Sequence, residues 1–452
     1  MTQKKKEEWE IDLENHVLNF NNTLASVLIG GKHRIMRTVS GEATYDGRIA
    51  YEFFRRQDLS MVYDNTAIKI GEKRDAKGIL KDVFANHLMA WAKHFQSRSF
   101  TGGIVFLPGH KAQPTYFNTW QDYSVKPKQD TQLLSLIYSH ITDVVCAGNN
   151  ELANYLLNWI AYTFQNPDKP AGSAIVFRGE KGSGKGTLGH FLRKIWGNHG
   201  LHISNAKHLV GNFNAHLADV CFLFADEAFF SGDKQHEGVL KAMITEPTVI
   251  CERKGIDAIQ QPNYLKILMA TNADYAVPAT RDERRYCVMD VSKKRIGDRQ
   301  YFDTLHLACN SEAVQSAFLY AMLYRNLTGF HTGDIPDSVG LRDHRYHSMK
   351  TYQRLIVDAL VKGSFYLDGD NWMDEVASEK LFTQYIHWCD AAKTGEYRRV
   401  TQSEFCKYFE KIYTSVKRVK SDKKRGFNFG SLNNAISLFE AYEKIKISEF
   451  SM

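Results

Sequence analysis

A glycine-rich run that ends in lysine and threonine constrains this chain more than any other feature. The run, called the glycine loop below, reads Gly179-Glu180-Lys181-Gly182-Ser183-Gly184-Lys185-Gly186-Thr187. It follows an apolar stretch, 174–177, that predicts a buried strand, and it precedes 188–196, which predicts a helix. In this arrangement the loop N–H groups and the helix dipole face one anion, and the lysine adds a point charge. The sequence therefore predicts a phosphate-binding loop.

The position after the lysine departs from the usual pattern of such loops. A serine or threonine there commonly ligates Mg²⁺, but here Gly186 follows Lys185 and the hydroxyl comes one place later, on Thr187. We expect phosphate binding by Lys185 and treat Thr187 as a candidate Mg²⁺ ligand. For the motif alone, a solvated surface loop is the alternative.

Two carboxylates follow the next apolar stretch. Residues 220–225 are all apolar and predict a strand buried on both faces or a core helix, and Asp226 and Glu227 come directly after them. Beside bound phosphates, Asp226 would hold Mg²⁺ through water. Glu227 would accept the proton of the water that attacks the γ-phosphate.

Two further predicted strands border polar residues suited to phosphoryl transfer. Residues 265–270 lead into Asn272, whose amide would orient the attacking water. Residues 286–291 follow Arg284 and Arg285, which would neutralise charge on the transferred group of the next subunit's nucleotide. Each piece alone is as well explained by a cap or a solvated charge, and it is their order along the chain that favours a site.

The stretch from about 129 to about 292 resembles the ATPase core of superfamily 3 helicases, in the branch found in phage and prophage replication proteins often labelled primases. The likeness rests on residues 179–187, 223–227, 240–246, 270–272 and 282–285. It implies an AAA+ P-loop fold of the α/β class, a hexameric ring, ATP and Mg²⁺ between neighbouring subunits, and single-stranded DNA in the channel. It also implies movement from 3′ to 5′. Segments 103–106 and 116–120 resemble the region before the ATPase in these proteins, less specifically.

Two basic segments are candidate DNA contacts. Residues 249–254 and 256–260 predict a hairpin about Gly255, and the resemblance implies that Arg253 and Lys254 at its tip grip DNA in the channel. A surface hairpin with solvated charges is the alternative. The second segment, 411–425, holds seven basic residues and one acidic residue, with aromatic residues nearby. Its candidate DNA-binding residues are Lys423, Lys424 and Arg425.

The chain is expected to contain four parts. They are a mixed α+β N-terminal domain (1–128), a helical collar (129–170), the AAA+ core (171–328) and a C-terminal winged-helix-like DNA-binding domain (339–452). The helical collar and the C-terminal winged-helix-like domain are implied by the resemblance. Ordinary core helices are an equal alternative for the collar, since 133–164 is rich in large apolar residues at helical spacing.

Composition limits the class of protein. The chain has 452 residues, 43% of them hydrophobic, so it can bury several cores, and its seven cysteines are scattered, as in reduced core positions. The net charge of +7 is modest and does not by itself indicate nucleic acid. No apolar stretch approaches the roughly 20 residues of a membrane span, and the N-terminus lacks an apolar signal core. We expect no membrane association and a location in the cytoplasm of a bacterial host.

These inferences favour an ATP-dependent replicative DNA helicase of a phage or mobile element. It would hydrolyse ATP, act on single-stranded or forked DNA as a hexamer, and meet replication initiator or primase proteins. One alternative is an ATP-switched DNA-binding initiator or assembly factor that never unwinds DNA. Another is a nucleotide kinase, whose loop also has glycine after the lysine but whose chain is far smaller. No acidic constellation suggests nucleotide polymerisation, so primase activity is not expected.

Overall fold

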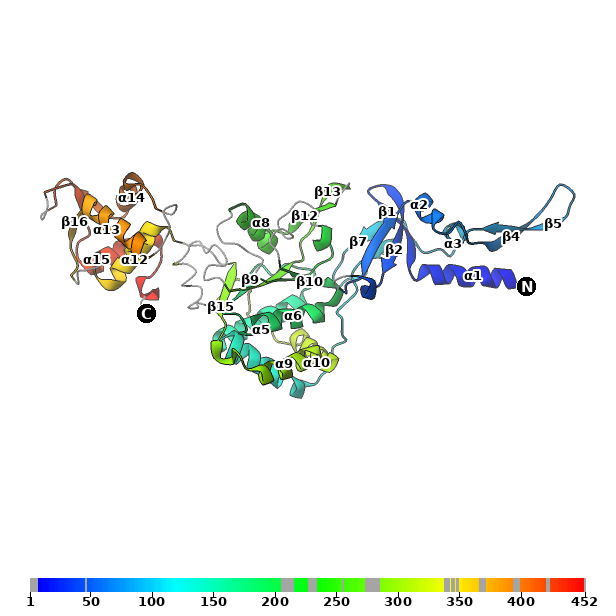
Figure 1. Cartoon of the computed structure of the whole chain (residues 1–452), viewed down its shortest axis with the longest axis horizontal. Coiled ribbons are helices and arrows are strands. Elements are labelled where there is room, and N and C mark those ends of the chain that lie inside the picture. Colours follow the sequence, from blue (N-terminus) through cyan, green and yellow to red (C-terminus); the bar gives the residue numbers. More distant parts are fainter. Residues whose placement is uncertain are drawn as a thin grey trace.

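The computed structural model describes residues 7–44, 47–204, 215–226, 234–253, 256–272, 285–336, 342, 346, 349–365, 371–392, 399–419 and 423–450. These residues form three successive parts, each with hydrophobic cores of its own (Figure 1). We call them the N-terminal part (7–118), the central part (119–336) and the C-terminal part (349–450).

The N-terminal part is built on a four-stranded sheet of order β3-β2-β1-β6. The strands are β1 (Leu24–Ile29), β2 (Lys32–Val39), β3 (Ala50–Phe54) and β6 (Ser99–Phe100). Around them lie α1 (Glu8–Asn21), α2 (Arg56–Met61), α3 (His87–Lys93), the hairpin of β4 (Ile68–Arg74) and β5 (Leu80–Ala85), and the pair β7 (Gly103–Val105) and β8 (Tyr116–Asn118). Helix α3 begins directly after β5, because Asn86 caps it by accepting from the N–H of Met89.

The central part contains a five-stranded parallel sheet of order β10-β11-β14-β9-β15. Its strands are β9 (Ala174–Arg178), β10 (Gly200–Ile203), β11 (Phe222–Asp226), β14 (Lys266–Thr271) and β15 (Tyr286–Asp290). The four strands expected from apolar runs are thus confirmed within two residues at each end. Because the strands are parallel, the glycine loop, Asp226 and Asn272 all emerge at the same edge of the sheet.

Both faces of this sheet are covered, which explains why its strands are apolar without alternation. One face packs on α5 (Asn150–Gln165), α6 (Lys185–Trp196), α9 (Arg299–Asn310) and α10 (Glu312–Leu323) (Figure 1). The other face packs on α8 (Lys234–Thr245). Before α5 lie α4 (Ser135–Ser139) and a π-helical turn, η3 (His140–Val145), so the helical spacing of large apolar residues over 133–164 corresponds to helical structure.

The chain entering the central part is bonded into the first layer of helices. Trp120 stacks on His199 with ring centroids 4.5 Å apart, and the N–H of Gln121 donates to His199 Nε2 at 2.8 Å. The N–H of Ser124 donates to the carbonyl of Ile195 at 3.0 Å. Earlier in the chain, Arg48 forms a salt bridge with Asp219 at 2.6 Å. This salt bridge links the N-terminal part to the central part.

The C-terminal part has a core of its own. It consists of α12 (Thr351–Lys362), β16 (Glu375–Ala377), α13 (Ser378–Ala391), α14 (Gln402–Phe409), β17 (Thr414–Val416), β18 (Gly426–Asn428) and α15 (Leu432–Glu443). The strands form an antiparallel sheet of order β16-β18-β17.

Three sequence expectations concern smaller features. The hairpin is confirmed as β12 (Thr248–Arg253) paired antiparallel with β13 (Ile256–Pro262). All seven cysteines are free thiols, six of them buried, as expected for reduced core positions. Among the described residues, no helix combines the length and the apolar character needed to cross a bilayer.

Candidate phosphate-binding site

The glycine loop turns sharply between β9 and α6. Gly182 and Gly184 have φ of +78° and +93°, in the left-handed region where a side chain is strained. Gly184 is the N-cap residue of α6, so the N–H groups of the first helical turn point toward the loop. This is the local geometry that the sequence predicted for an anion cradle.

Lys185 is held over the loop. It is 7% exposed, and its Nζ donates to the carbonyl of Glu180 at 3.2 Å and to Oδ1 of Asn272. The contact with Asn272 joins the start of α6 to the residue that directly follows β14. Two residues that the sequence placed in one site are therefore in direct contact.

Ser183 adds a second polar group to the loop. Its side chain is fully buried, and its Oγ has no hydrogen-bond partner among the described residues. A buried hydroxyl without a partner is costly, because it has lost water and gained nothing in return. A phosphate oxygen in the loop would satisfy it.

The loop opens into a cleft of about 530 Å³. Thr187 and Asp226, the two candidate Mg²⁺ ligands, both line it. Asp226 lies close to the helix start, since a Cβ built on Gly186 would lie 3.9 Å from its Oδ2. The absence of a side chain at Gly186 thus leaves room between the helix and the carboxylate. Oxygen ligands of this kind suit a hard cation such as Mg²⁺.

Arg285 is not brought to this cleft. Its carbonyl accepts from the N–H of Ala174, at the amino end of β9, whereas the glycine loop follows the carboxyl end. Five residues of strand separate the two ends by about 16 Å. The action of Arg285 on the nucleotide of a neighbouring subunit stays a prediction. Glu227, Lys254 and Arg284 lie outside the described residues, as does the side chain of Arg253.

His140, which was not among the residues predicted for the site, is hydrogen-bonded to the backbone of the glycine loop. His140 Nε2 donates to the carbonyl of Gly184 at 3.3 Å, and Nδ1 accepts from the hydroxyl of Tyr301 at 2.9 Å. We assign this tautomer because a carbonyl oxygen can only accept. Burial lowers the pKa of His140 to about 4, so the ring is neutral at pH 7. No local pattern marks His140, since its partners are distant in sequence.

Acid is expected to destabilise the fold through His140. The folded pKa, about 4, lies below the ordinary 6.5. As the pH falls from 6.5 toward 4, His140 binds a proton in the unfolded chain but not in the folded one. The free energy of unfolding, which is highest above pH 6.5, therefore decreases. The loss at pH 5 should be about 2 kcal/mol relative to neutral pH. Urea unfolding of wild type and His140→Gln at pH 7.5 and 5.0 should show a smaller loss in the variant. Equal losses would contradict this role.

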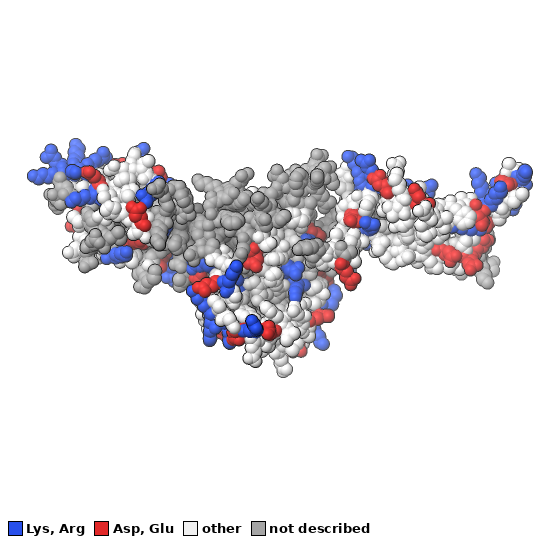
Figure 2. Space-filling model, viewed as in Figure 1, with Lys and Arg blue, Asp and Glu red and all other residues white. Residues whose placement is uncertain are grey.

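The candidate DNA-binding residues of the C-terminal part lie in the turn between β17 and β18. Lys424 pairs with Glu379 at 2.7 Å and Arg425 with Glu410 at 2.8 Å, yet their side chains remain 62% and 72% exposed. Lys423, at φ +52°, is the first residue described after positions 420–422. Lys and Arg side chains gather on the left end of the molecule in Figure 2, over the C-terminal part. The arrangement offers a basic surface, with two of its charges partly offset by carboxylates.

Comparisons with known proteins place this geometry in context. Residues 177–285 match a family model described as a family of unknown function (DUF5906). Over 137 residues the chain is 27% identical to the DNA Primase-polymerase of Nitratiruptor phage NrS-1, and this match spans 30% of the chain but only 19% of that relative. The apo structure of the NrS-1 C-terminal region is similar at a TM-score of 0.58 and 14% identity, covering 94% of this chain and 100% of the solved one. An A form apo structure of that region has a TM-score of 0.55 at 14% identity, covering 90% and 96%.

These findings correct the expected function. The superfamily 3 helicase assignment is wrong, because the curated relative is a primase-polymerase and the matching solved structures are its C-terminal region. The two alternatives, an initiator without unwinding activity and a nucleotide kinase, find no support either. The physical reason is that a loop of nine residues specifies a phosphate cradle, which unrelated enzymes share, and does not specify the reaction.

The expected fold class is corrected on the same grounds. The chain has the fold of the NrS-1 C-terminal region along 94% of its length, not an AAA+ P-loop ATPase core with a collar and a winged-helix-like ending. That expectation came from resemblance between short motifs. Motifs constrain the ends of strands, whereas the arrangement of the whole chain depends on long-range packing that no short motif encodes.

Proposed function

We propose that this chain is an enzyme of phage DNA replication, of the primase-polymerase kind, whose glycine loop binds the phosphates of a nucleoside triphosphate. The relation to the NrS-1 protein supports the replication context. The loop supports the ligand class. The site of action would be the cytoplasm of the bacterial host, with DNA as the partner.

One observation carries the choice of ligand: Lys185 and Ser183 are both buried at the mouth of a loop whose glycines are left-handed. A solvated surface loop would expose its lysine, because desolvating an ammonium group is costly unless a partner compensates for it. Lys185 keeps polar partners on two strand ends, and the Ser183 hydroxyl needs an acceptor or donor. A triphosphate would supply oxygens to both.

The finer part of the proposal is that the enzyme cleaves the bound nucleotide with the help of Mg²⁺. Thr187 and Asp226 would hold the ion, since both line the cleft beside the loop. A cation held there would supply positive charge that offsets the charge developing on the phosphates during cleavage. Asn272, through its contact with Lys185, would keep the ammonium aligned with the same phosphates. ATP is the nucleotide to be tried first.

Two measurements test the proposal. Calorimetric titration of the chain with ATP and the other nucleoside triphosphates, with Mg²⁺ present, should detect binding of at least one. Incubation with labelled nucleotide and single-stranded DNA should then consume it, and the products identify the reaction: a diphosphate reports hydrolysis, whereas pyrophosphate with extended DNA reports synthesis. A chain that binds none of these nucleotides would sink the ligand assignment, and one that binds without consuming any would sink the enzymatic part.

Lys423 is expected to contribute more than Lys424 to the salt dependence of DNA affinity. Each phosphate contact contributes about 0.9 to the log–log salt slope on B-DNA and about 0.7 on single strands. Lys423→Ala should lower the slope by that full amount, whereas Lys424→Ala should lower it by less, because Glu379 shares the ammonium of Lys424. Lys446→Ala, which removes a lysine paired with Glu440 outside the turn, is the control. Fluorescence anisotropy across a salt series measures all four proteins. A slope unchanged by Lys423→Ala would remove this turn from the DNA interface.

A further inference from the structure

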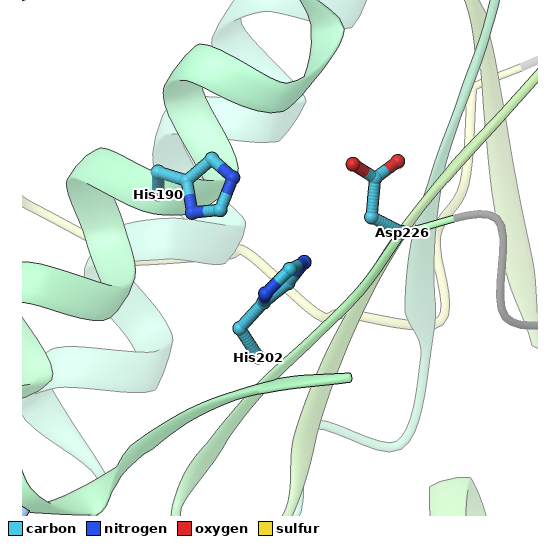
Figure 3. A group of neighbouring side chains, drawn as sticks. All are labelled: His190, His202 and Asp226. Atoms are coloured by element: carbon cyan, nitrogen blue, oxygen red, sulfur yellow. The ribbon is translucent and has the colours of Figure 1, made fainter. Parts of the chain in front are cut away.

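Two histidines and an aspartate lie together beside the glycine loop. His190 lies on α6, His202 on β10 and Asp226 at the end of β11. One ligand atom of each lies within 4.8 Å of the others, and all three residues are partly buried. Figure 3 shows the two rings and the carboxylate facing a common space from three different elements. Among the described residues, this is the group of histidine, cysteine and acidic side chains close enough to hold a metal ion.

The fold places these residues by close packing. β10 and β11 are parallel neighbours, and His202 is in register with Phe224, two residues before Asp226. Helix α6 approaches the sheet closely at Gly189, where a Cβ would overlap the ring of Phe224 and lie 2.7 Å from its Cζ. His190 is the next residue, so the close approach at Gly189 determines how far His190 lies from the sheet. The ring of His190 then lies 4.8 Å from that of His202, centroid to centroid.

We propose that His190, His202 and Asp226 bind one divalent transition-metal ion, with Zn²⁺ as the representative. Two imidazoles and one carboxylate favour such an ion over Mg²⁺ or Ca²⁺, which prefer oxygen ligands throughout. Three protein ligands leave at least one coordination position for water or another oxygen. This set differs from the Thr187 and Asp226 pair considered for Mg²⁺, because it adds two nitrogen ligands and needs no hydroxyl.

The spacing is compatible with metal binding after small side-chain rotations. Ligand atoms about 2.1 Å from a tetrahedral ion lie roughly 3.4 Å apart. The ligand atoms of the three groups lie within 4.8 Å of one another, so they must close by at most about 1.4 Å. Rotation about the side-chain bonds of the two histidines provides this. The ion would then lie beside the cleft that Asp226 lines together with Lys185 and Thr187.

The metal site goes beyond the proposed nucleotide function and does not depend on it. Full-length protein freed of metal with a chelator is titrated with Zn²⁺ by calorimetry, and with Co²⁺ by visible absorption. Wild type should take up one tight equivalent that 5 mM Mg²⁺ does not displace, and Co²⁺ should give ligand-field bands. His202→Gln and His190→Asn should each weaken that equivalent by about 10²-fold or more, as loss of a ligand does.

Two controls separate the outcomes. His306→Gln removes a histidine that lines the same cleft outside the group, and it should keep the Zn²⁺ equivalent. Lys185→Ala should also keep it, even where nucleotide binding is lost, so the two proposals fail separately. Circular dichroism confirms that each variant is folded, and metal should raise the melting temperature of wild type but not of the histidine variants. If His202→Gln and His190→Asn bind Zn²⁺ as wild type does, the two rings only pack against Phe224 and the site is disproved.

Discussion

Replacing Lys185 with alanine is expected to weaken nucleoside triphosphate binding by about 10- to 10²-fold. A hydrogen bond to a charged group contributes about 1.5–3 kcal/mol, and each 1.4 kcal/mol is a factor of ten in affinity. The side chain of Lys185 is buried, and the residue lines the cleft that the phosphates would occupy. Calorimetric titration with ATP in the presence of Mg²⁺ measures the change.

The matched control is Lys126→Ala, which removes a lysine exposed on the surface and paired with Asp122. It should bind nucleotide as wild type does. Thermal unfolding of both variants separates lost binding from lost folding, because Lys185 also contacts Asn272 in the loop itself. Affinity of Lys185→Ala within threefold of wild type would show that the loop does not bind phosphate through this residue.

Replacing Gly189 with alanine is expected to lower the free energy of unfolding by about 3 kcal/mol, the upper part of the range for overpacking a filled core. The added methyl would overlap the ring of Phe224, which is fully buried and cannot move aside. Alanine would ordinarily favour a helix over glycine by about 1 kcal/mol, so the clash must exceed that gain. Urea unfolding measures the difference.

Gly238→Ala is the control for this prediction, because it makes the same change in another helix. Gly238 lies on α8, is exposed, and has no atom of the described residues within 4 Å of an added Cβ. It should therefore stabilise the protein by about 0.5–1 kcal/mol through helix propensity alone. Opposite signs for the two substitutions would establish that close approach of α6 to the sheet decides the outcome at Gly189. A stabilised Gly189→Ala would contradict the packing described above.

The parts of the fold that could be predicted from sequence are those encoded locally. A strand buried on both faces must be apolar throughout, so 174–177 could be predicted as a strand and 220–225 as either a buried strand or a core helix. Parallel pairing then accounts for the meeting of Lys185, Asp226 and Asn272 at one edge of the sheet. Left-handed backbone strongly favours glycine, which is why the glycine loop could be recognised from the sequence alone.

The parts that could not be predicted depend on contacts between distant segments. His140 reaches the loop from 44 residues away in sequence, and His190 and His202 meet Asp226 only because Gly189 lets the helix approach. Nothing in their immediate neighbours marks these histidines. The helicase assignment failed for a related reason, since residues near strand ends describe a phosphate cradle and leave the reaction open.

The polar and aromatic contacts of residues 120–125 bear on how this chain can be divided for experiments. Trp120 covers His199, Ser124 bonds to Ile195, and Val125 belongs to the core shared with α5 and α6. A fragment that begins after residue 128 would lose all of these contacts, and the carboxyl end of α6 would be exposed to water. A recombinant central fragment would accordingly need its first residue ahead of Trp120, with the segment that carries Arg48 either retained or its partner Asp219 replaced.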